Sequence, residues 1–309
     1  MTRSNCSSTS VTYLNGHVIK SVAVQDRALH YGDGFFTTIL LADEWILNWA
    51  AHWRRLKKSA LRLRFNTLDE SQFLQQIAQA VTQFNLHNGR ESSRTRVVKV
   101  MVSRGTSGRG YAIPESFELV ILIQVSIVPF RVEITPKLNF PPPPVPQHIE
   151  CCQTHASIQM QLAGVKHFNR LDSVLARTEV EKKGHQEGIM LNALGQVISG
   201  TQSNLFLLKG NVLITPLLDL SGVEGTTRYQ LSKHIHELGL RWQARHVTLK
   251  ELHQADELFL SNAIRGIMPI KQFHKTVYSS TQTLTIHQWW NEKQSQLAVR
   301  LPSITFKNT

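Results

Sequence analysis

The sequence of 309 residues contains only three cysteines, which limits the chemistry that cysteine can carry here. Cys151 and Cys152 are adjacent and cannot easily bridge each other, and Cys6 stands far from both. No CxxC pair and no Cys/His cluster has the spacing of a metal site. We therefore expect neither a disulfide framework nor a bound metal. Such cysteine usage fits the reducing cytoplasm, which is the compartment that we expect.

Long apolar runs are also lacking. The most apolar run, LVILIQVSIV at 119–128, is shorter than the roughly 18 residues that cross a bilayer, and it is typical of a core strand. The N-terminal sequence MTRSNCSSTS has no hydrophobic segment of the kind found in secretory signals. The sequence therefore predicts no membrane partner.

Acidic residues are scarce, with 22 Asp and Glu against 34 Lys and Arg, a formal net charge of +12. Nucleic acid, a membrane surface and small anionic ligands all attract such a chain. The basic residues are spread along the sequence, without a Lys/Arg block or a nucleic-acid-binding motif. We therefore expect no nucleic-acid partner, and a solvated basic surface is the simplest explanation of the charge.

The periodicity of apolar residues predicts an α+β fold with two domains. The first domain, 1–128, is predicted to contain an Asn15-Gly16 hairpin and a second hairpin across 42–44. Two amphipathic helices and strands at 96–103 and 117–128 follow them. Residues 129–146 form a linker that contains the proline run Pro141–Pro146, for which a docking motif is the alternative. The second domain, 147–309, has strands near 188–216 and a helix from Thr226 to Gly239.

Lys166 is the leading candidate for a catalytic residue. It stands in LAGVKHFNRLDSVLAR, between an apolar segment and a predicted helix whose apolar face carries Leu171, Val174 and Leu175. A lysine at such a buried junction has a lowered pKa, which frees its amine for nucleophilic or base chemistry. A lysine that extends its ammonium to solvent is the alternative explanation.

Three further segments carry glycines or polar groups in patterns typical of ligand sites. In DRALHYGDGFFTTI at 26–39, two glycines permit a close backbone approach. RGTSGRGY at 104–111 carries Arg104 and Arg109, whose guanidinium groups suit a carboxylate, although a flexible basic loop would look the same. GVEGTTRYQL at 222–231 places Thr226 and Thr227 at a helix start, which is either a phosphate site or an ordinary helix cap.

The order of these segments resembles the fold-type IV pyridoxal-phosphate enzymes, from about Tyr13 to Ile270. This family includes D-amino-acid aminotransferases, branched-chain aminotransferases and aminodeoxychorismate lyases. The FFTT that follows GDG, the SRGTSGRGY loop and the KHFNRL that follows the lysine are similar to the lyases. The resemblance implies a D-amino-acid-aminotransferase-like fold, pyridoxal 5'-phosphate as cofactor, and a homodimer. It also implies conversion of 4-amino-4-deoxychorismate to 4-aminobenzoate and pyruvate in folate biosynthesis.

The resemblance also implies roles for individual residues. Lys166 matches the lysine that binds the cofactor covalently, and Arg109 is the candidate for a substrate carboxylate. Tyr31 and Thr38 are candidates for the wall of the substrate site. The residues expected to bind the cofactor phosphate are Arg55, Thr226, Thr227, Asn262 and, through its backbone, Ala263.

One position departs from the family pattern. Ser199 in VISGTQSNLF stands where the family has a glutamate that pairs with the pyridine nitrogen of the cofactor and keeps it protonated. A serine can hydrogen-bond there but supplies no charge. This weakens the expectation of transamination more than that of the lyase reaction, whose substrate gains driving force by becoming aromatic. An aminotransferase of the same fold and a non-enzymatic anion or nucleic-acid binder on a decayed scaffold remain open.

Overall fold

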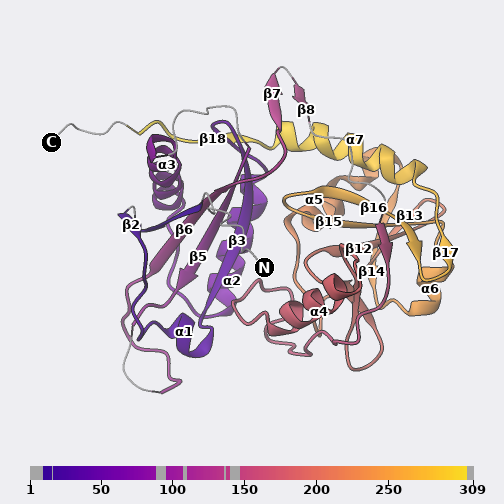
Figure 1. Cartoon of the computed structure of the whole chain (residues 1–309), viewed down its shortest axis with the longest axis horizontal. Coiled ribbons are helices and arrows are strands. Elements are labelled where there is room, and N and C mark those ends of the chain that lie inside the picture. The colour runs from indigo at the N-terminus through magenta and orange to yellow at the C-terminus, as the bar shows by residue number, and fades with distance from the viewer. Residues whose placement is uncertain are drawn as a thin grey trace, which may run out of the picture. The chain divides into compact units, whose positions relative to one another are not determined.

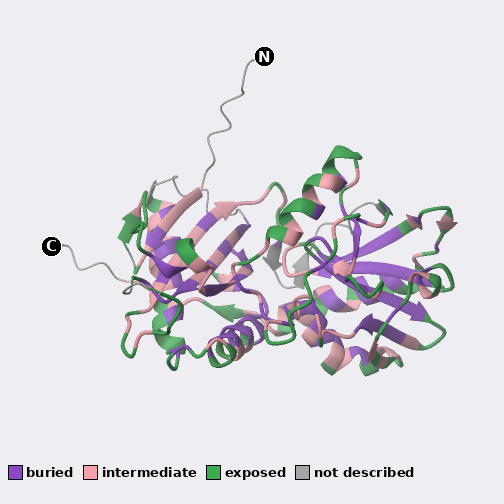
Figure 2. Cartoon of the chain, turned by 90° about the horizontal axis from the view of Figure 1, so that it is seen from below, coloured by how far each residue is buried: buried purple, intermediate pink, exposed green. Residues whose placement is uncertain are grey.

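The chain folds into two compact units (Figure 1). The computed structural model describes residues 10–15, 17–87, 95–106, 110–135, 137–139 and 147–304. The N-terminal unit comprises Met1–Pro141 together with Ser295–Thr309, and the C-terminal unit comprises Pro142–Gln294. In both units Figure 2 shows buried strands beneath exposed loops and helix faces.

The N-terminal unit is built on a seven-stranded sheet in the order β18-β4-β3-β5-β6-β1-β2. Its strands are β1 (Ser10–Leu14), β2 (His17–Ile19), β3 (Gly34–Ala42), β4 (Trp45–Ile46), β5 (Arg96–Ser103), β6 (Val120–Ile127) and β18 (Val299–Arg300). Its helices are α1 (Arg27–Tyr31), α2 (Trp49–Arg62) and α3 (Glu70–His87). Both predicted hairpins are confirmed, since β1 pairs with β2 and β3 pairs with β4, each antiparallel.

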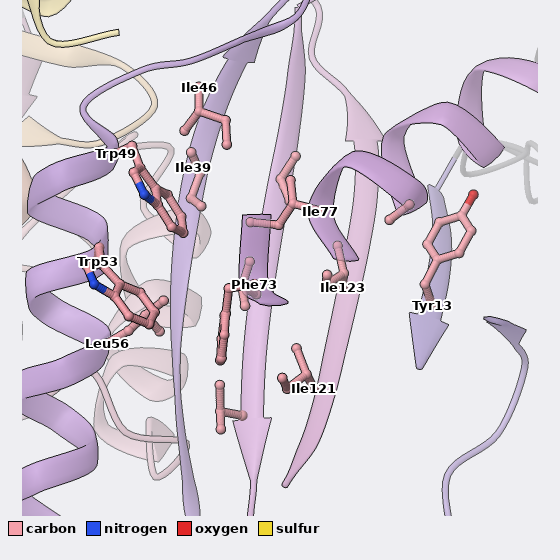
Figure 3. Packing of buried hydrophobic residues seen from close by; sticks show 14 of the residues in the cluster. Tyr13, Ile39, Ile46, Trp49, Trp53, Leu56, Phe73, Ile77, Ile121 and Ile123 are labelled. Atoms are coloured by element: carbon pink, nitrogen blue, oxygen red, sulfur yellow. The ribbon is translucent and has the colours of Figure 1, made fainter. Parts of the chain in front are cut away.

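The core of this unit follows from the amphipathic patterns seen in the sequence. Alternate residues of β3 and β6, such as Ile39 and Ile123, point to one face of the sheet, and α2 and α3 cover that face (Figure 3). Trp49 and Trp53 stand one turn apart on α2, and their rings stack with centroids 5.9 Å apart. Phe73 of α3 packs against Trp53, with ring centroids 5.5 Å apart.

The end of the chain returns to the N-terminal unit, whereas the sequence assigned all of 147–309 to the second domain. Strand β18 pairs with β4, the backbone N–H of Leu301 donates to the carbonyl of Glu44 at 2.8 Å, and Arg300 forms an ion pair with the Glu44 carboxylate. Within the predicted linker 129–146, β7 (Glu133–Thr135) and β8 (Lys137–Asn139) form a short antiparallel pair. The Pro141–Pro146 run lies outside the described residues.

The C-terminal unit has a second seven-stranded sheet in the order β14-β13-β12-β15-β16-β17, with β9 added beside β16, and a small pair formed by β10 and β11. Its strands are β9 (Gln147–Ile149), β10 (Ile189–Leu191), β11 (Val197–Gly200), β12 (Asn204–Lys209), β13 (Val212–Pro216), β14 (Arg241–Arg245), β15 (Glu257–Asn262), β16 (Gly266–Phe273) and β17 (Thr276–Val277). Its helices are α4 (Leu171–Lys182), α5 (Thr226–His234), the 3-10 helix η1 (Ile235–Leu238), α6 (Leu249–His253) and α7 (Thr281–Gln296).

Strand β12 is buried on both faces of this sheet. Leu205 and Leu207 belong to one apolar cluster, and Phe206 and Leu208 belong to another on the opposite face. Strands β13 and β14 are parallel, so they need a crossover, and α5 with η1 provides it. The N-terminus of α5 therefore follows the carboxyl end of β13. Of the helices in the described ranges, none is long and apolar enough to cross a membrane.

The apolar face of the helix after Lys166 is exposed in this structure. Leu171, Val174 and Leu175, which their spacing places on one face of α4, are 76%, 55% and 60% exposed. The helix buries Ala176 and Val180, which pack in an apolar cluster with Cys152, Ala156, Met190 and Ile198. Helical spacing identifies a face, but it does not identify which face the rest of the chain covers.

Arg104, which the sequence suggested as a ligand for a carboxylate, is instead committed to partners within the fold, including the carboxylate of Asp33. The side chain is 1% exposed and donates to the carbonyls of Leu63 at 2.7 Å and Arg64 at 3.0 Å. It also donates to Asp33 at 2.9 Å, and its guanidinium lies 3.9 Å from the centroid of the Phe65 ring. Arg104 therefore fastens the end of β5 to the end of α2.

Arg104→Lys should destabilise the protein by about 2 kcal/mol or more, because a lysine cannot reproduce the planar set of donors and leaves buried carbonyls unsatisfied. Urea unfolding monitored by tryptophan fluorescence would measure the change. Arg62→Lys, an exposed substitution on α2, is the matched control and should stay within about 0.5 kcal/mol of the parent. Equal unfolding midpoints for the two variants would contradict the structural role of Arg104.

Candidate functional site

In the C-terminal unit, the segment that carries Lys166 pairs with the segment that leads into α5. Gly164 and Val223 form a parallel bridge, with the N–H of Gly164 donating to Gly222 at 2.9 Å and the N–H of Glu224 donating to Gly164 at 3.0 Å. Two residues beyond the bridge, the two segments reach Lys166 and Gly225. The segment of the half-buried Lys166 therefore lies beside the loop that enters α5.

Gly225, the N-cap of α5, occupies a position that only glycine fits. A Cβ atom there would collide with Oδ1 of Asn204. The Asn204 amide donates to the carbonyl of Val223 at 2.9 Å, so the asparagine cannot easily move away. The start of β12 therefore holds the loop before α5 in place. Because the N-cap of α5 is a glycine, no N-cap side chain covers the first N–H groups of the helix.

Thr226 and Thr227 are both buried, but their hydroxyl groups differ in their partners. Thr227 Oγ1 donates to the carbonyl of Asn262 at 3.3 Å. Within the described part of the chain, Thr226 Oγ1 has no hydrogen-bond partner, nor has Oγ of the neighbouring buried Ser261 on β15. Buried hydroxyls without partners are costly, and helix N-termini favour anions. An anionic oxygen at this helix start would satisfy these groups.

Asn262 and Ala263 form the other wall of this region. Oδ1 of Asn262 accepts from the backbone N–H groups of Ile264 at 3.0 Å and Arg265 at 2.8 Å, which folds residues 262–265 into a turn around Ala263. Backbone hydrogen bonds of Gly164 thus join the segment of Lys166 to the loop that enters α5, and Thr227 joins α5 to the 262–263 turn. Whether Lys166, Thr226, Thr227 and the 262–263 turn bind the cofactor stays a prediction.

Ser199 lies on β11, and its hydroxyl donates to the carbonyl of Gly200 at 2.8 Å. The buried carboxylate of Glu187 lies on the other side of this strand, because it approaches the position that a Cβ of Gly200 would occupy. Glu187 accepts from the Thr201 N–H at 2.8 Å and from Ser203 Oγ at 2.7 Å. It is therefore committed to the turn after β11 and does not replace a carboxylate at position 199.

Arg55 and Thr38, two candidates from the sequence, lie in the N-terminal unit. Arg55 of α2 is buried and donates to Thr37 Oγ1 at 3.3 Å, and the same oxygen lies 2.6 Å from Nδ1 of His52. Thr38, the neighbour of Thr37, points to the opposite face of β3. There it pairs in register with Lys99 of β5. The role of Arg55 toward the phosphate and that of Thr38 toward the substrate remain predictions.

Lys99 is a functional candidate that the sequence reasoning missed. It is half-buried, its Nζ lies 5.0 Å from the centroid of the Phe36 ring, and burial lowers the pKa of its amine. The signal was present as a lysine in the middle of the apolar strand RVVKVMVS. Its alignment with Thr38, however, depends on strand pairing between residues that are about 60 positions apart in the sequence.

Tyr31 and the glycine-rich loop meet in the N-terminal unit. The rings of Tyr31 and Tyr111 have centroids 5.2 Å apart, and the guanidinium of Arg27, the first residue of α1, lies 4.9 Å from the centroid of the Tyr31 ring. Arg27 donates to the carbonyls of Gly110 and Tyr111, both at 3.1 Å. Arg109 itself lies outside the described residues, so its role as a carboxylate ligand stays a prediction.

His167, directly after Lys166, is a second candidate that sequence reasoning did not single out. Its ring is buried, and Nε2 lies 2.7 Å from the Arg170 guanidinium. Burial and, to a smaller extent, the charge of Arg170 lower the pKa of this imidazole to about 4. The ring is therefore neutral near neutral pH.

Comparison with known proteins identifies the family. The sequence model of the class IV aminotransferases matches residues 34–273, and the chain belongs to this family. Its fold is that of the fold-type IV enzymes.

Its relatives include both lyases and aminotransferases. The aminodeoxychorismate lyase of Vibrio harveyi is 30% identical over 259 residues, which cover 84% of this chain and 89% of the lyase. The branched-chain-amino-acid aminotransferase of Salmonella typhimurium is 27% identical over 84% of this chain and 83% of the aminotransferase. The crystal structure of 4-amino-4-deoxychorismate lyase from Pseudomonas aeruginosa superposes with a TM-score of 0.74 at 30% identity, covering 91% of this chain and 97% of that one.

The residues around α5 fit the phosphate of the predicted cofactor. The hydroxyls of Thr226 and Ser261 lack partners in the described ranges, and the close approach at Gly225 keeps the helix N-terminus open. Both features suit an anion with several acceptor oxygens. In the described parts of the chain no group of three or more His, Cys, Asp and Glu side chains could hold a metal ion.

A pair of isosteric substitutions should separate the two threonines of α5. Thr226→Val removes a buried hydroxyl that has no partner in the described ranges, so the cofactor-free protein should keep or gain stability while its affinity for pyridoxal 5'-phosphate falls about tenfold. Thr227→Val removes a donor to Asn262, so the cofactor-free protein should lose about 1 kcal/mol. Thermal unfolding without cofactor and equilibrium binding would measure these effects. Loss of stability in Thr226→Val with unchanged affinity would exclude this threonine from the phosphate site.

Proposed function

We propose that the protein is a 4-amino-4-deoxychorismate lyase that forms 4-aminobenzoate and pyruvate in folate biosynthesis. The observation that carries this proposal is Ser199, a neutral residue on the face of β11 opposite to Glu187, where the family has a glutamate. A neutral residue there suits a reaction whose substrate supplies driving force by becoming aromatic. The similarity to lyases at 30% identity along most of the chain supports the same conclusion.

Pyridoxal 5'-phosphate is the cofactor of this chain. When bound, it supplies an acceptor for the negative charge that develops beside the substrate nitrogen. Thr226 and Thr227, at the N-terminus of α5, and Arg55 would hold its phosphate, and Lys166 would hold its aldehyde carbon. The protein supplies the position and the charge, while the cofactor supplies the electron acceptor.

Lys166 performs the proton transfers in this proposal. Its amine, set free from the aldehyde carbon by the substrate amine, is neutral and would take the proton from the ring carbon that bears the substrate nitrogen. The bond between the neighbouring ring carbon and the ether oxygen then breaks, the ring becomes aromatic, and enolpyruvate leaves. The Lys166 ammonium returns the proton to the methylene carbon of enolpyruvate, which yields pyruvate. One residue thus serves as base and then as acid.

The substrate carries two carboxylates, and basic residues in the chain suit them. Lys99 keeps its amine half-buried beside Phe36, where an anionic partner would offset the cost of burying its charge. Arg109, Tyr31 and Thr38 are the other candidates for contact with the substrate. We further propose that the protein acts as a homodimer, as the family resemblance implies.

Transamination of branched-chain or D-amino acids is the second candidate. It is favoured by the similarity to branched-chain-amino-acid aminotransferases at 27% identity over 84% of the chain. The two reactions are distinguished by assay, because the lyase releases pyruvate from aminodeoxychorismate and the aminotransferase moves an amino group to 2-oxoglutarate.

Lys166→Ala should abolish turnover and eliminate the cofactor that borohydride otherwise attaches to the protein, because the variant lacks the amine that holds the aldehyde carbon. Mass spectrometry of peptides after reduction gives the attachment site. Lys182→Ala, at the exposed end of α4, is the control and should retain both attachment and activity. Cofactor attached to another lysine in the parent protein would refute the assignment.

Ser199→Glu should raise transamination of simple amino acids relative to lyase activity, because a carboxylate beside the pyridine nitrogen would keep it protonated. Both activities are to be measured in both proteins, with Ser199→Gln as the uncharged control of similar size. The parent protein should show far more lyase than transaminase activity. Efficient transamination by the parent would instead support the aminotransferase.

A further inference from the structure

The buried imidazole of His167 has one polar partner and one nitrogen without any in the described parts of the chain. The side chain is 8% exposed, and its Nε2 lies 2.7 Å from Nη2 of Arg170. A guanidinium can only donate, so Nε2 must accept, and the single ring proton of the neutral imidazole is placed on Nδ1. Arg170 therefore fixes the tautomer of His167.

Nδ1 of His167 is shut off from solvent and has no hydrogen-bond partner among the described residues. Buried N–H groups are satisfied in the great majority of folded proteins, because an unsatisfied one is costly. The charged groups that act on this ring are Arg170, which lowers its pKa, and Asp172, which raises it by less. With a pKa near 4 the ring does not serve as a proton donor near neutral pH, but its N–H can donate a hydrogen bond.

His167 lies in the segment that carries the candidate lysine. The residue directly follows Lys166, and the same segment pairs with the loop that enters α5 through the bridge of Gly164 and Val223. A ligand that occupies this region brings oxygens of negative charge, either from the cofactor or from the substrate carboxylates. These are strong acceptors for a buried N–H group.

We propose that Nδ1–H of His167 donates a hydrogen bond to an anionic oxygen of the bound ligand, and that Arg170 is the positioning residue that keeps the proton on Nδ1. This inference rests on the proposed cofactor site around Lys166. It assigns the histidine of KHFNRL a role in binding rather than in proton transfer.

NMR of protein labelled with 15N-histidine tests the proposal directly, with the His167 signal assigned by its loss in His167→Gln. The ligand-free protein, the complex with pyridoxal 5'-phosphate, and that complex with added 4-aminobenzoate are compared. We expect a slowly exchanging Nδ1–H signal, shifted downfield, only when ligand is bound. Its appearance with the cofactor alone assigns the acceptor to the cofactor, and its appearance only after 4-aminobenzoate assigns it to a substrate carboxylate.

An Nδ1–H signal that is the same in all three samples would overturn the proposal while leaving the lyase function intact. The near-visible absorbance of the same samples reports cofactor binding independently. Absence of that absorbance would remove the proposed function and this inference together, so the two failures are distinguishable.

Two substitutions of similar size separate the two ring nitrogens. Asparagine places an N–H donor close to the position of Nδ1, whereas glutamine places its amide near the position of Nε2. His167→Asn should therefore bind the ligand within about threefold of the parent, and His167→Gln should bind about tenfold more weakly. Both variants disturb packing, so a purely structural role would lower thermal stability and affinity in parallel. Equal affinity of the two variants would contradict donation from Nδ1.

Discussion

The close approach of Asn204 to Gly225 is the constraint on which the C-terminal site depends. The asparagine side chain fills the space that any side chain at position 225 would need, and it binds the carbonyl of Val223. Val223 in turn pairs with Gly164, two residues before Lys166. One polar side chain at the start of β12 thus holds the loop that pairs with the segment of Lys166 and then enters α5.

A second buried polar group acts at the same point of the chain. Glu187 accepts hydrogen bonds from Thr201 and Ser203, and Ser203 immediately precedes Asn204. Adjacent residues, Ser203 and Asn204, therefore fix the turn that follows β11 and the loop that enters α5. Because a buried carboxylate is tolerated only when its oxygens are satisfied, the turn and Glu187 stabilise each other. A change at either would disturb both the turn after β11 and the start of β12.

The sequence predicted those features that depend on local pattern. The hairpins and the α2 and α3 helices follow from turn residues and periodicity, and the segments around Lys166 could be proposed as one site because each has a recognisable local sequence. The exposed face of α4 at Leu171 was not predictable, because periodicity does not say which face is covered. The internal hydrogen bonds of the Arg104 guanidinium and the pairing of Lys99 with Thr38 could not be predicted in the same way. Both depend on contacts between segments that are far apart in the sequence.

The chain keeps several cations in surroundings that disfavour their charge. Burial lowers the pKa of Lys99, Arg170 and Arg228, and Arg228 stands in the first turn of α5, where a helix N-terminus adds positive potential. Holding these groups charged costs stability in the ligand-free protein. An anion bound beside any of these groups would offset that cost and would couple binding to folding stability at that group. These three cations account for only part of the net charge of +12.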